Sequence, residues 1–318
     1  MKILFITSNR IGDAVLSTGI LGKLIELHPS ADITVVCGPY AAELFYAVPN
    51  LEQLYVLRKK SWNRHWIKLW MVCIETPWDL IVDLRNSFTT RLLRANRRLY
   101  RTQSTGQHKV IENARVLGLE KTPPSPRLWL DEQAWANAAG FLPEVRPFIT
   151  LGPAANWRAK QWPADRFAAL AQKLTAPRGP FPNAPVLVIA AQAEQSYVEP
   201  VLAALGEQAK PVIGQELLAV AACLQESALF VGNDSGLMHM AAAMNTPTLG
   251  LFGPGLESIY GPWGPRSAFV RTPESRAELL KKQSGTPPGR PRPNLMDTLT
   301  VDAVFAAALD LLRKAESP

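Results

Sequence analysis

The sequence is poor in cysteine and has no apolar run long enough to cross a membrane. Cys37, Cys73 and Cys223 are odd in number and far apart, which excludes a disulfide framework and a zinc site of paired cysteines. No window approaches the roughly 18 apolar residues that a spanning helix needs, and the apolar start at residues 1–6 is too short for a signal-peptide core. These absences predict a cytoplasmic protein with unreactive thiols.

Several motifs of catalysis and cofactor binding are absent as well. The chain has no Walker A motif, HExxH, CxxC or Ser-His-Asp order, and no GxGxxG to support a dinucleotide site. It also has no Asp-x-Asp pair, so a metal that bridges a diphosphate has no obvious ligands. Basic side chains and helix N-termini would have to neutralise the phosphates instead. We therefore predict no metal and no cofactor.

The length and composition are those of a folded protein with two domains. The chain has 318 residues, of which 47% are hydrophobic, and domains of about 150 residues are typical. Its formal net charge of +7 favours an anionic partner. Charge alone does not distinguish nucleic acid, an anionic membrane face and an acidic substrate.

Apolar strands alternate with helical segments along both halves of the chain. Strands are predicted at 1–6, 31–39, 51–57 and 78–85, and again at 146–157, 186–191, 211–214 and from 229 onward. This alternation predicts parallel sheets covered by helices on both faces. The connector 122–133 carries three prolines and is the best candidate for a boundary. We place the domains at residues 1–143 and 144–318.

Residues 229–254 combine a strand, a polar turn, a small-residue helix and a second strand. Asn233, Asp234 and Ser235 are good helix-capping residues, and Gly236 has no side chain to block a ligand. A helix that starts in this way offers free N–H groups and a positive dipole to a phosphate. An ordinary βαβ unit with a well-capped helix would have the same pattern, so both interpretations stay open.

Four further residues are candidates for chemistry, and each has a plain structural alternative. Asp13 follows the first strand, where it can face a cleft or complement a helix dipole. Lys160 can neutralise a diphosphate or lie in solvent. Glu194 can bind a ribose or cap a helix. His239, alone among Leu, Met and Ala, is more typical of a core residue than of a catalyst.

Basic residues gather in the first half of the chain, where Trp62, Trp66 and Trp70 lie among them. Such runs usually form solvated faces, but this one leaves open a surface for an anionic amphiphile. No nucleic-acid motif accompanies it. Near the other end, the Pro/Gly-rich residues 273–297 predict a mobile surface loop, and 301–315 predict a terminal amphipathic helix.

Together these pieces resemble the glycosyltransferase family 9 heptosyltransferases of lipopolysaccharide inner-core assembly. The matching parts are KILFITSNRIGDAVLSTGIL, WDLIVDLR, KQWPADRFAAL and FVGNDSGLMHMAAAMNTPTLGLFGP followed by YGPWGP. The resemblance implies a GT-B fold of two Rossmann-like parallel-sheet domains that face a central cleft. It also implies inverting, metal-independent transfer of a heptose or related sugar from a nucleotide-diphosphate donor, ADP-heptose, to a lipopolysaccharide core acceptor.

The resemblance also assigns roles, with acceptor binding in the first domain and donor binding in the second. Asp13 matches the presumed general base and Lys160 the lysine that stabilises the leaving diphosphate. The donor-binding set is Asn156, Glu194, Asp234, Ser235, Gly236 and His239, and the acceptor-binding set is Arg58, Lys59, Lys60 and Arg64. We leave open whether the terminal helix packs back on the first domain. Unlike many members, this chain has no cysteine in the late loop.

Three alternatives accompany this interpretation. A non-catalytic nucleotide-sugar-binding protein would share the fold, but the joint presence of Asp13, Lys160 and Asp234 counts against it. A transferase of the same fold with another donor sugar would share the site. A nicotinamide-dependent oxidoreductase would need the missing glycine fingerprint. We expect no nucleic-acid partner and leave open a peripheral contact with the inner membrane face.

Overall fold

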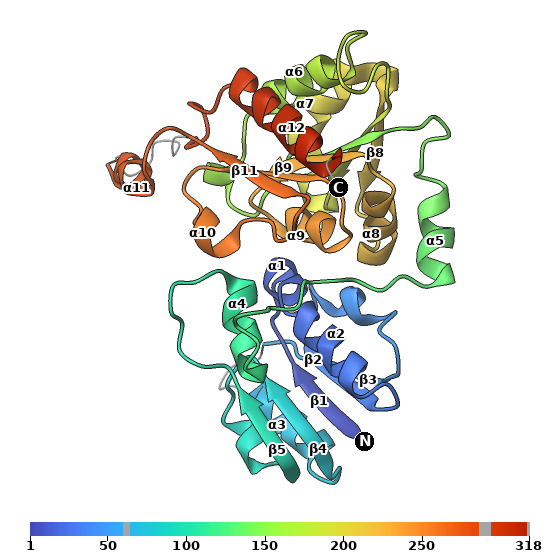
Figure 1. The fold of residues 1–318 in the computed structure, drawn as a ribbon, viewed down its shortest axis with the longest axis vertical. Coiled ribbons are helices and arrows are strands. Elements are labelled where there is room, and N and C mark those ends of the chain that lie inside the picture. The colour runs from blue at the N-terminus through green and yellow to red at the C-terminus, as the bar shows by residue number, and fades with distance from the viewer. Residues whose placement is uncertain (60–63, 286–293, 317–318) are drawn as a thin grey trace. The chain divides into compact units, whose positions relative to one another are not determined.

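The computed structural model describes residues 1–59, 64–285 and 294–316, which form two compact units (Figure 1). Unit 1 is Met1–Asp131 and unit 2 is Glu132–Pro318. Helix α5 (Glu132–Ala139) packs against α8 (Leu217–Gln225) of unit 2. The Asn137 side-chain amide donates to Glu216 Oε2 at 2.8 Å. Residues 132–143, which the sequence-based boundary assigns to the first domain, therefore belong with the second sheet.

Unit 1 is built on a parallel sheet whose described strands run in the order β3-β2-β1-β4-β5. Its elements are β1 (Lys2–Ile6), α1 (Ile11–Val15), α2 (Thr18–Leu27), β2 (Asp32–Cys37), η1 (Ala42–Phe45), β3 (Leu51–Val56), α3 (Arg64–Cys73), β4 (Trp78–Asp83), η3 (Thr89–Leu92), β5 (Ala95–Tyr100), α4 (Lys109–Ala114) and η4 (Arg115–Leu117). The strand order reverses direction between β1 and β4, the topological switch point where such sheets bind ligands.

The central strands of unit 1 are apolar because both of their faces are covered. Leu4 and Ile6 of β1 pack with Leu69 and Cys73 of α3, and the intervening Phe5 faces the other side. Strands buried on both faces appear in a sequence as continuous apolar runs. For this reason β1 and β4 lie where the sequence predicts strands.

Strand β5 has no counterpart in the prediction, which treats residues 85–109 as an arginine-rich stretch. Its sequence ANRRLY lies at the edge of the sheet and pairs only with β4 among the described strands. An edge strand needs no apolar run, because one of its sides and much of its surface face water. Because of its arginines, β5 lacks the alternation of apolar and polar residues that would predict a strand from the sequence.

Unit 2 repeats the architecture, with described strands in the order β11-β10-β9-β6-β7-β8, all parallel. After α5 its elements are β6 (Ile149–Gly152), η5 (Arg158–Lys160), α6 (Ala164–Thr175), β7 (Val186–Ala190), η6 (Gln192–Glu194), α7 (Gln195–Leu205), η7 (Gly206–Gln208), β8 (Ala209–Ile213), α8, β9 (Leu229–Asn233), α9 (Gly236–Ala243), β10 (Thr248–Phe252), α10 (Glu257–Tyr260), β11 (Ser267–Arg271), α11 (Arg276–Ser284) and α12 (Val301–Glu316). This is the Rossmann strand order, and its switch point lies between β6 and β9.

The last helix, α12, packs against α6 and the β10–β11 edge of its own unit. The fully buried Trp162 joins these layers: its indole N–H donates to Leu299 O at 2.8 Å, and its ring meets Phe167 edge-on at 5.0 Å between centroids. The terminal segment is thus part of the second core (Figure 1).

The predicted mobile loop at 273–297 is wrong over residues 276–284, which form helix α11. Ser275 caps this helix with a reciprocal capping box to Glu278. Leu279 on its inner face is 1% exposed and packs with Leu295 and Ala159. A single buried leucine in a polar sequence is too weak a signal for periodicity to reveal. Residues 286–293 of the predicted loop lie outside the described residues.

Candidate active site

The switch point of the second sheet brings together two residues that are distant in the sequence. β6 and β9 are paired neighbours, and the chain leaves the carboxyl end of each at the same edge of the sheet. The first loop carries Lys160 and the second carries Asp234. The Lys160 ammonium donates to Asp234 Oδ2 in an ion pair whose side chains are 23% and 9% exposed.

Asn233, at the end of β9, holds the two loops in register. Its side chain is fully buried, its Oδ1 accepts the Trp162 backbone N–H at 3.0 Å, and its amide donates to Pro153 O. Both ends of the segment 153–162 are therefore tied to one side chain. Because Lys160 lies within that segment, Asn233 positions the lysine beside Asp234. The sequence suggests only a capping role for Asn233, and the structure shows that it belongs to the strand.

The expected side-chain cap of α9 is not formed. Ser235 is the N-cap residue in extended geometry, but its hydroxyl makes no capping hydrogen bond. This buried hydroxyl has no hydrogen-bond partner among the residues that the structure describes. A buried donor without a partner is costly, so such a group is well suited to a ligand. The helix starts at Gly236 directly beside Asp234, and thus the amide-bearing turn and the ion pair share one place.

The remaining donor-side candidates are more dispersed. Asn156 is exposed in the loop between β6 and η5, and His239 is buried on α9. The Glu194 carboxylate accepts the Ala191 backbone N–H at 3.1 Å. This is a helix-capping contact, the structural alternative to the predicted ribose contact. Glu194 follows β7, which is the neighbour of β6.

In unit 1, Asp13 lies in the first turn of α1, which follows the carboxyl end of β1. It is half-buried, and its carboxylate makes no hydrogen bond or ion pair within the described part of the chain. A carboxylate that no neighbour engages keeps its lone pairs available for a proton. Both of its sequence-based interpretations, a cleft base and a helix-dipole partner, are consistent with this position.

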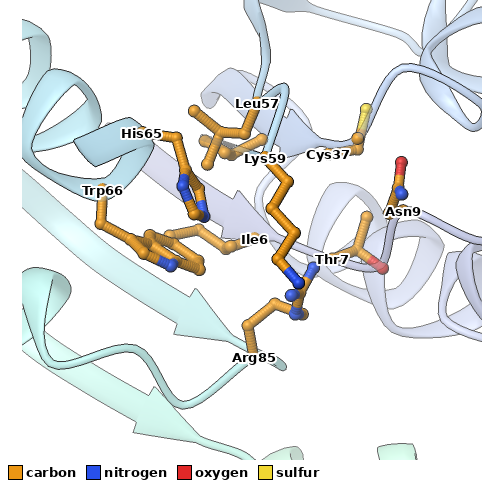
Figure 2. Close-up of a pocket in the computed structure, with 11 residues that line it drawn as sticks. Ile6, Thr7, Asn9, Cys37, Leu57, Lys59, His65, Trp66 and Arg85 are labelled. Atoms are coloured by element: carbon orange, nitrogen blue, oxygen red, sulfur yellow. The ribbon is translucent and has the colours of Figure 1, made fainter. Parts of the chain in front are cut away.

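A pocket of about 200 Å³ opens at the switch point of the first sheet (Figure 2). Its floor is formed by the ends of β1, β2 and β3, and its polar lining comprises Thr7, Asn9, Lys59, His65 and Arg85, with Trp66 beside them. Among the residues that the structure describes, no carboxylate lines this pocket. Lys59 and Arg85 reach toward the same part of the pocket, beside Thr7, which makes it suitable for an anion (Figure 2).

The four predicted acceptor residues divide between pocket and surface. Lys59 lines the pocket, whereas Arg58 and Arg64 are exposed and do not line it. Lys60 lies outside the described residues. Two further residues, Asn9 and Arg85, line the pocket although the sequence does not single them out for this role. The guanidinium carbon of Arg85 lies over the Trp66 ring, 5.9 Å from the ring centroid. In the sequence, Arg85 is only the first residue of the arginine-rich stretch 85–109.

The cysteines are unsuited to chemistry, although Cys37 lines the pocket of unit 1. All three are free and buried. Burial raises the pKa of Cys37 and of Cys73 to about 12. Burial also raises the pKa of Cys223, to about 11, although the charges of Lys210 and Arg146 act to lower it. A thiol with such a pKa is protonated at neutral pH and is a poor nucleophile. This agrees with the expectation of unreactive thiols.

Comparison with known proteins decides the family. The model of glycosyltransferase family 9 (heptosyltransferase) matches residues 63–288. The chain belongs to glycosyltransferase family 9. Lipopolysaccharide heptosyltransferase 2 of Escherichia coli K12 is 25% identical over 317 residues, which cover 85% of this chain and 88% of that protein.

Solved structures show the same fold for this family 9 member. The E. coli ADP-heptose lps heptosyltransferase II has a TM-score of 0.77 at 23% identity, with 100% of both chains covered. E. coli heptosyltransferase WaaC with ADP-2-deoxy-2-fluoro heptose has a TM-score of 0.70 at 16% identity, with 98% of this chain and 99% of that chain covered. The chain is thus a glycosyltransferase of the heptosyltransferase family, and its two parallel-sheet domains form a GT-B fold.

The described residues of this glycosyltransferase contain neither a membrane-spanning helix nor a cluster of metal ligands. None of the described helices is both long and apolar enough to span a bilayer. Within the same residues, no three His, Cys, Asp or Glu side chains gather in a group that could hold a metal ion.

Gly255 is a site residue that the sequence analysis missed, and it provides a direct test. A Cβ at this position would lie 2.3 Å from Asp234 Oδ2 and 3.2 Å from Phe252 Cδ1. Gly255→Ala should therefore push the carboxylate from its place and weaken donor binding by at least about tenfold, because a displaced charged contact costs more than about 1.4 kcal/mol. Isothermal titration with the donor measures the change.

The matched control for this substitution is Gly140→Ala, where an added Cβ would meet nothing within 4 Å. It should leave donor affinity unchanged. Equal donor affinity of Gly255→Ala and the native protein would mean that Asp234 does not contact the donor from this position.

Proposed function

We propose that this glycosyltransferase moves a heptose, or a closely related sugar, from ADP-heptose to a lipopolysaccharide core acceptor, with inversion and without a metal. The observation that carries the proposal is the Lys160–Asp234 pair at the switch point of the second sheet. Nucleotides bind at this place in doubly wound folds. The pair also offers the two groups that a sugar diphosphate needs, a cation and a hydroxyl acceptor.

On the donor side, we assign Lys160 to the diphosphate, where its charge stabilises the leaving group. Asp234 accepts hydrogen bonds from the sugar hydroxyls. The unpartnered Ser235 hydroxyl and the turn at Gly236 lie against the phosphates. Asn156 and His239 are assigned to the same phosphates, and Glu194 to the ribose, with less support from their contacts.

On the acceptor side, we assign Asp13 as the general base. Its carboxylate takes the proton of the acceptor hydroxyl while that oxygen attacks the anomeric carbon. The bond from this carbon to the phosphate oxygen breaks, and the nucleoside diphosphate leaves with the electron pair. Attack from the face opposite the leaving group inverts the configuration. The basic residues Arg58, Lys59, Lys60 and Arg64, with Arg85 added, hold the anionic acceptor.

We propose metal independence because the protein itself supplies the positive charge that neutralises the leaving diphosphate. The leaving diphosphate needs neutralisation, and Lys160 with the start of α9 supplies it from the protein. We place the reaction in the cytoplasm, because buried free thiols are typical of a reducing compartment.

The test is a transfer assay of the purified protein with ADP-heptose and a lipopolysaccharide core acceptor, preceded by a thermal-shift screen of ADP-, GDP- and UDP-sugars. We expect stabilisation by the ADP-sugar, an inverted product, and an unchanged rate in excess EDTA. Stabilisation by a GDP- or UDP-sugar instead would identify another donor. Stabilisation without turnover would identify a non-catalytic binding protein, and loss of activity in EDTA would contradict the role of Lys160 as the neutralising charge.

A further inference from the structure

Two groups of unit 2 confine the Asp234 carboxylate. Its Oδ2 pairs with the Lys160 ammonium, and it also meets the turn 253–257, which follows β10. A Cβ on Gly255 would lie 2.3 Å from Asp234 Oδ2 and 3.3 Å from its Cγ, so the backbone of this turn abuts the carboxylate. A movement of the turn therefore changes the space in which Asp234 lies.

The turn 253–257 has little regular structure of its own to fix its position. It follows the last residue of β10, and its helix, α10, begins only at Glu257. In between lie Gly253, Pro254 and Gly255. Proline has no N–H to donate, and glycine restricts the backbone least of all residues. Groups from outside the turn must therefore hold it against Asp234.

Arg271, the last residue of β11, holds both ends of the turn. Its Nη1 donates to Glu257 Oε1 at 2.8 Å, and its Nη2 donates to Gly253 O at 3.3 Å and to Glu274 O at 3.2 Å. The Arg271 and Glu257 side chains are 29% and 18% exposed, so water screens this ion pair only in part. A planar guanidinium with several fixed donors is suited to join groups from separate parts of the backbone.

Arg276, at the start of α11, adds a third attachment, because its Nε donates to Pro254 O at 3.1 Å. We call Arg271 and Arg276 the arginine clamp. The same helix also contacts the loop of the other ion-pair partner, since its buried Leu279 packs with Ala159, the residue before Lys160. The segment from β11 to α11 thus supports the loops on which both members of the Lys160–Asp234 pair depend.

We propose that the arginine clamp positions the Asp234 carboxylate for the donor sugar, through the turn 253–257. Arg271 and Arg276 are positioning residues, because their contacts are with the turn and with Glu257 and Glu274. A carboxylate that accepts sugar hydroxyls must be held within about 0.5 Å of its productive place by the residues around it. The inference rests on the proposed function, in which Asp234 contacts the sugar.

The experiment is calorimetric titration of the full chain with ADP-heptose and, separately, with ADP. Arg271→Ala should weaken ADP-heptose binding at least about tenfold, because it releases both ends of the turn that confines Asp234. ADP binding should stay within about twofold, since ADP lacks the sugar to which Asp234 is assigned. In an Asp234→Ala background, Arg271→Ala should cost less than about twofold in ADP-heptose binding, because the positioned group is absent.

Two milder variants keep the test decisive should Arg271→Ala not fold. Arg271→Lys keeps the charge but loses the planar fork, and Arg276→Ala loses one attachment, so each should weaken ADP-heptose binding by about threefold. The matched control is Arg266→Ala. Arg266 precedes the amino end of β11 and donates to Asn245 O at 3.1 Å, at the opposite end of the strand. This variant should bind ADP-heptose like the native chain.

The outcomes separate this inference from the proposed function. If Asp234→Ala weakens ADP-heptose binding but the clamp variants bind it like the native chain, the clamp does not position Asp234. Equal losses of ADP and ADP-heptose binding in Arg271→Ala, or an equal loss of ADP-heptose binding with and without Asp234, would assign Arg271 a general structural role and overturn the inference. If Asp234→Ala itself binds ADP-heptose like the native chain, the proposed sugar contact fails, and the inference fails with it.

Discussion

Asp13→Ala should lower kcat by at least about 100-fold, because a positioned general base contributes about 10²–10⁴ to a rate. Donor affinity should stay within about twofold of the native value, since the carboxylate acts on the acceptor proton and not on the bound nucleotide. Single-turnover kinetics with saturating ADP-heptose measure the first quantity, and calorimetric titration of the donor measures the second.

The control for this substitution is Asp32→Ala. Asp32 is also an aspartate of unit 1, but it is exposed at the amino end of β2, away from the carboxyl edge of the sheet. It should turn over like the native enzyme. Near-native turnover of Asp13→Ala would refute the base assignment, and an equal loss of donor binding would point to a structural role.

The second large effect is expected at Lys160. Lys160→Ala removes the partner of a carboxylate that is 9% exposed, and leaving that charge unpaired should cost about 1–3 kcal/mol of unfolding free energy. Donor affinity and kcat should both fall by at least about tenfold, because the lysine is assigned to the diphosphate before and during its departure. Urea unfolding, donor titration and steady-state kinetics report the three effects.

Lys173→Ala is the matched control, because it breaks an ion pair to Asp302 in the same unit with side chains 46% and 84% exposed. It should cost under about 1 kcal/mol and leave donor binding unchanged. Lys160→Ala combined with Asp234→Asn should recover stability but not donor binding. Full recovery of donor binding in the double variant would show that the pair is structural only.

The repeated α/β architecture was predictable because its cause is local. Strands β1 and β4 are buried on both faces, so each appears as a short apolar run that ends at a polar turn. Two of the elements that the sequence did not predict, β5 and α11, were missed for a matching reason. β5 at the sheet edge is rich in arginine, and α11 buries Leu279 in an otherwise polar sequence, so neither carries the periodic signal of a packed face.

The candidate site was predictable in its residues but not in its geometry. Lys160 and Asp234 were chosen through resemblance to a family motif, and each had a plain structural alternative on its own. Their ion pair joins residues 74 positions apart, and it depends on β6 lying next to β9 in the sheet. Strand order is a long-range property that periodicity does not encode.

Two features changed their interpretation once the tertiary structure was known. Asn233, which the sequence presents as a capping residue, ties the segment 153–162 to the end of β9 through buried hydrogen bonds. Gly255 gained a role because a Cβ at this position would clash with the Asp234 carboxylate. Neither contact can be predicted from the amino-acid composition around these residues.

The sequence by itself determined the alternation of strands and helices, the positive charge of residues 58–101 and the motifs of family 9. Each of these features depends only on residues that lie close together in the sequence. Only the tertiary structure decided that Lys160 meets Asp234, and that the buried Asn233 side chain ties the segment 153–162 to the end of β9. These outcomes depend on which strands and helices become neighbours, and that choice is made by packing of the whole domain.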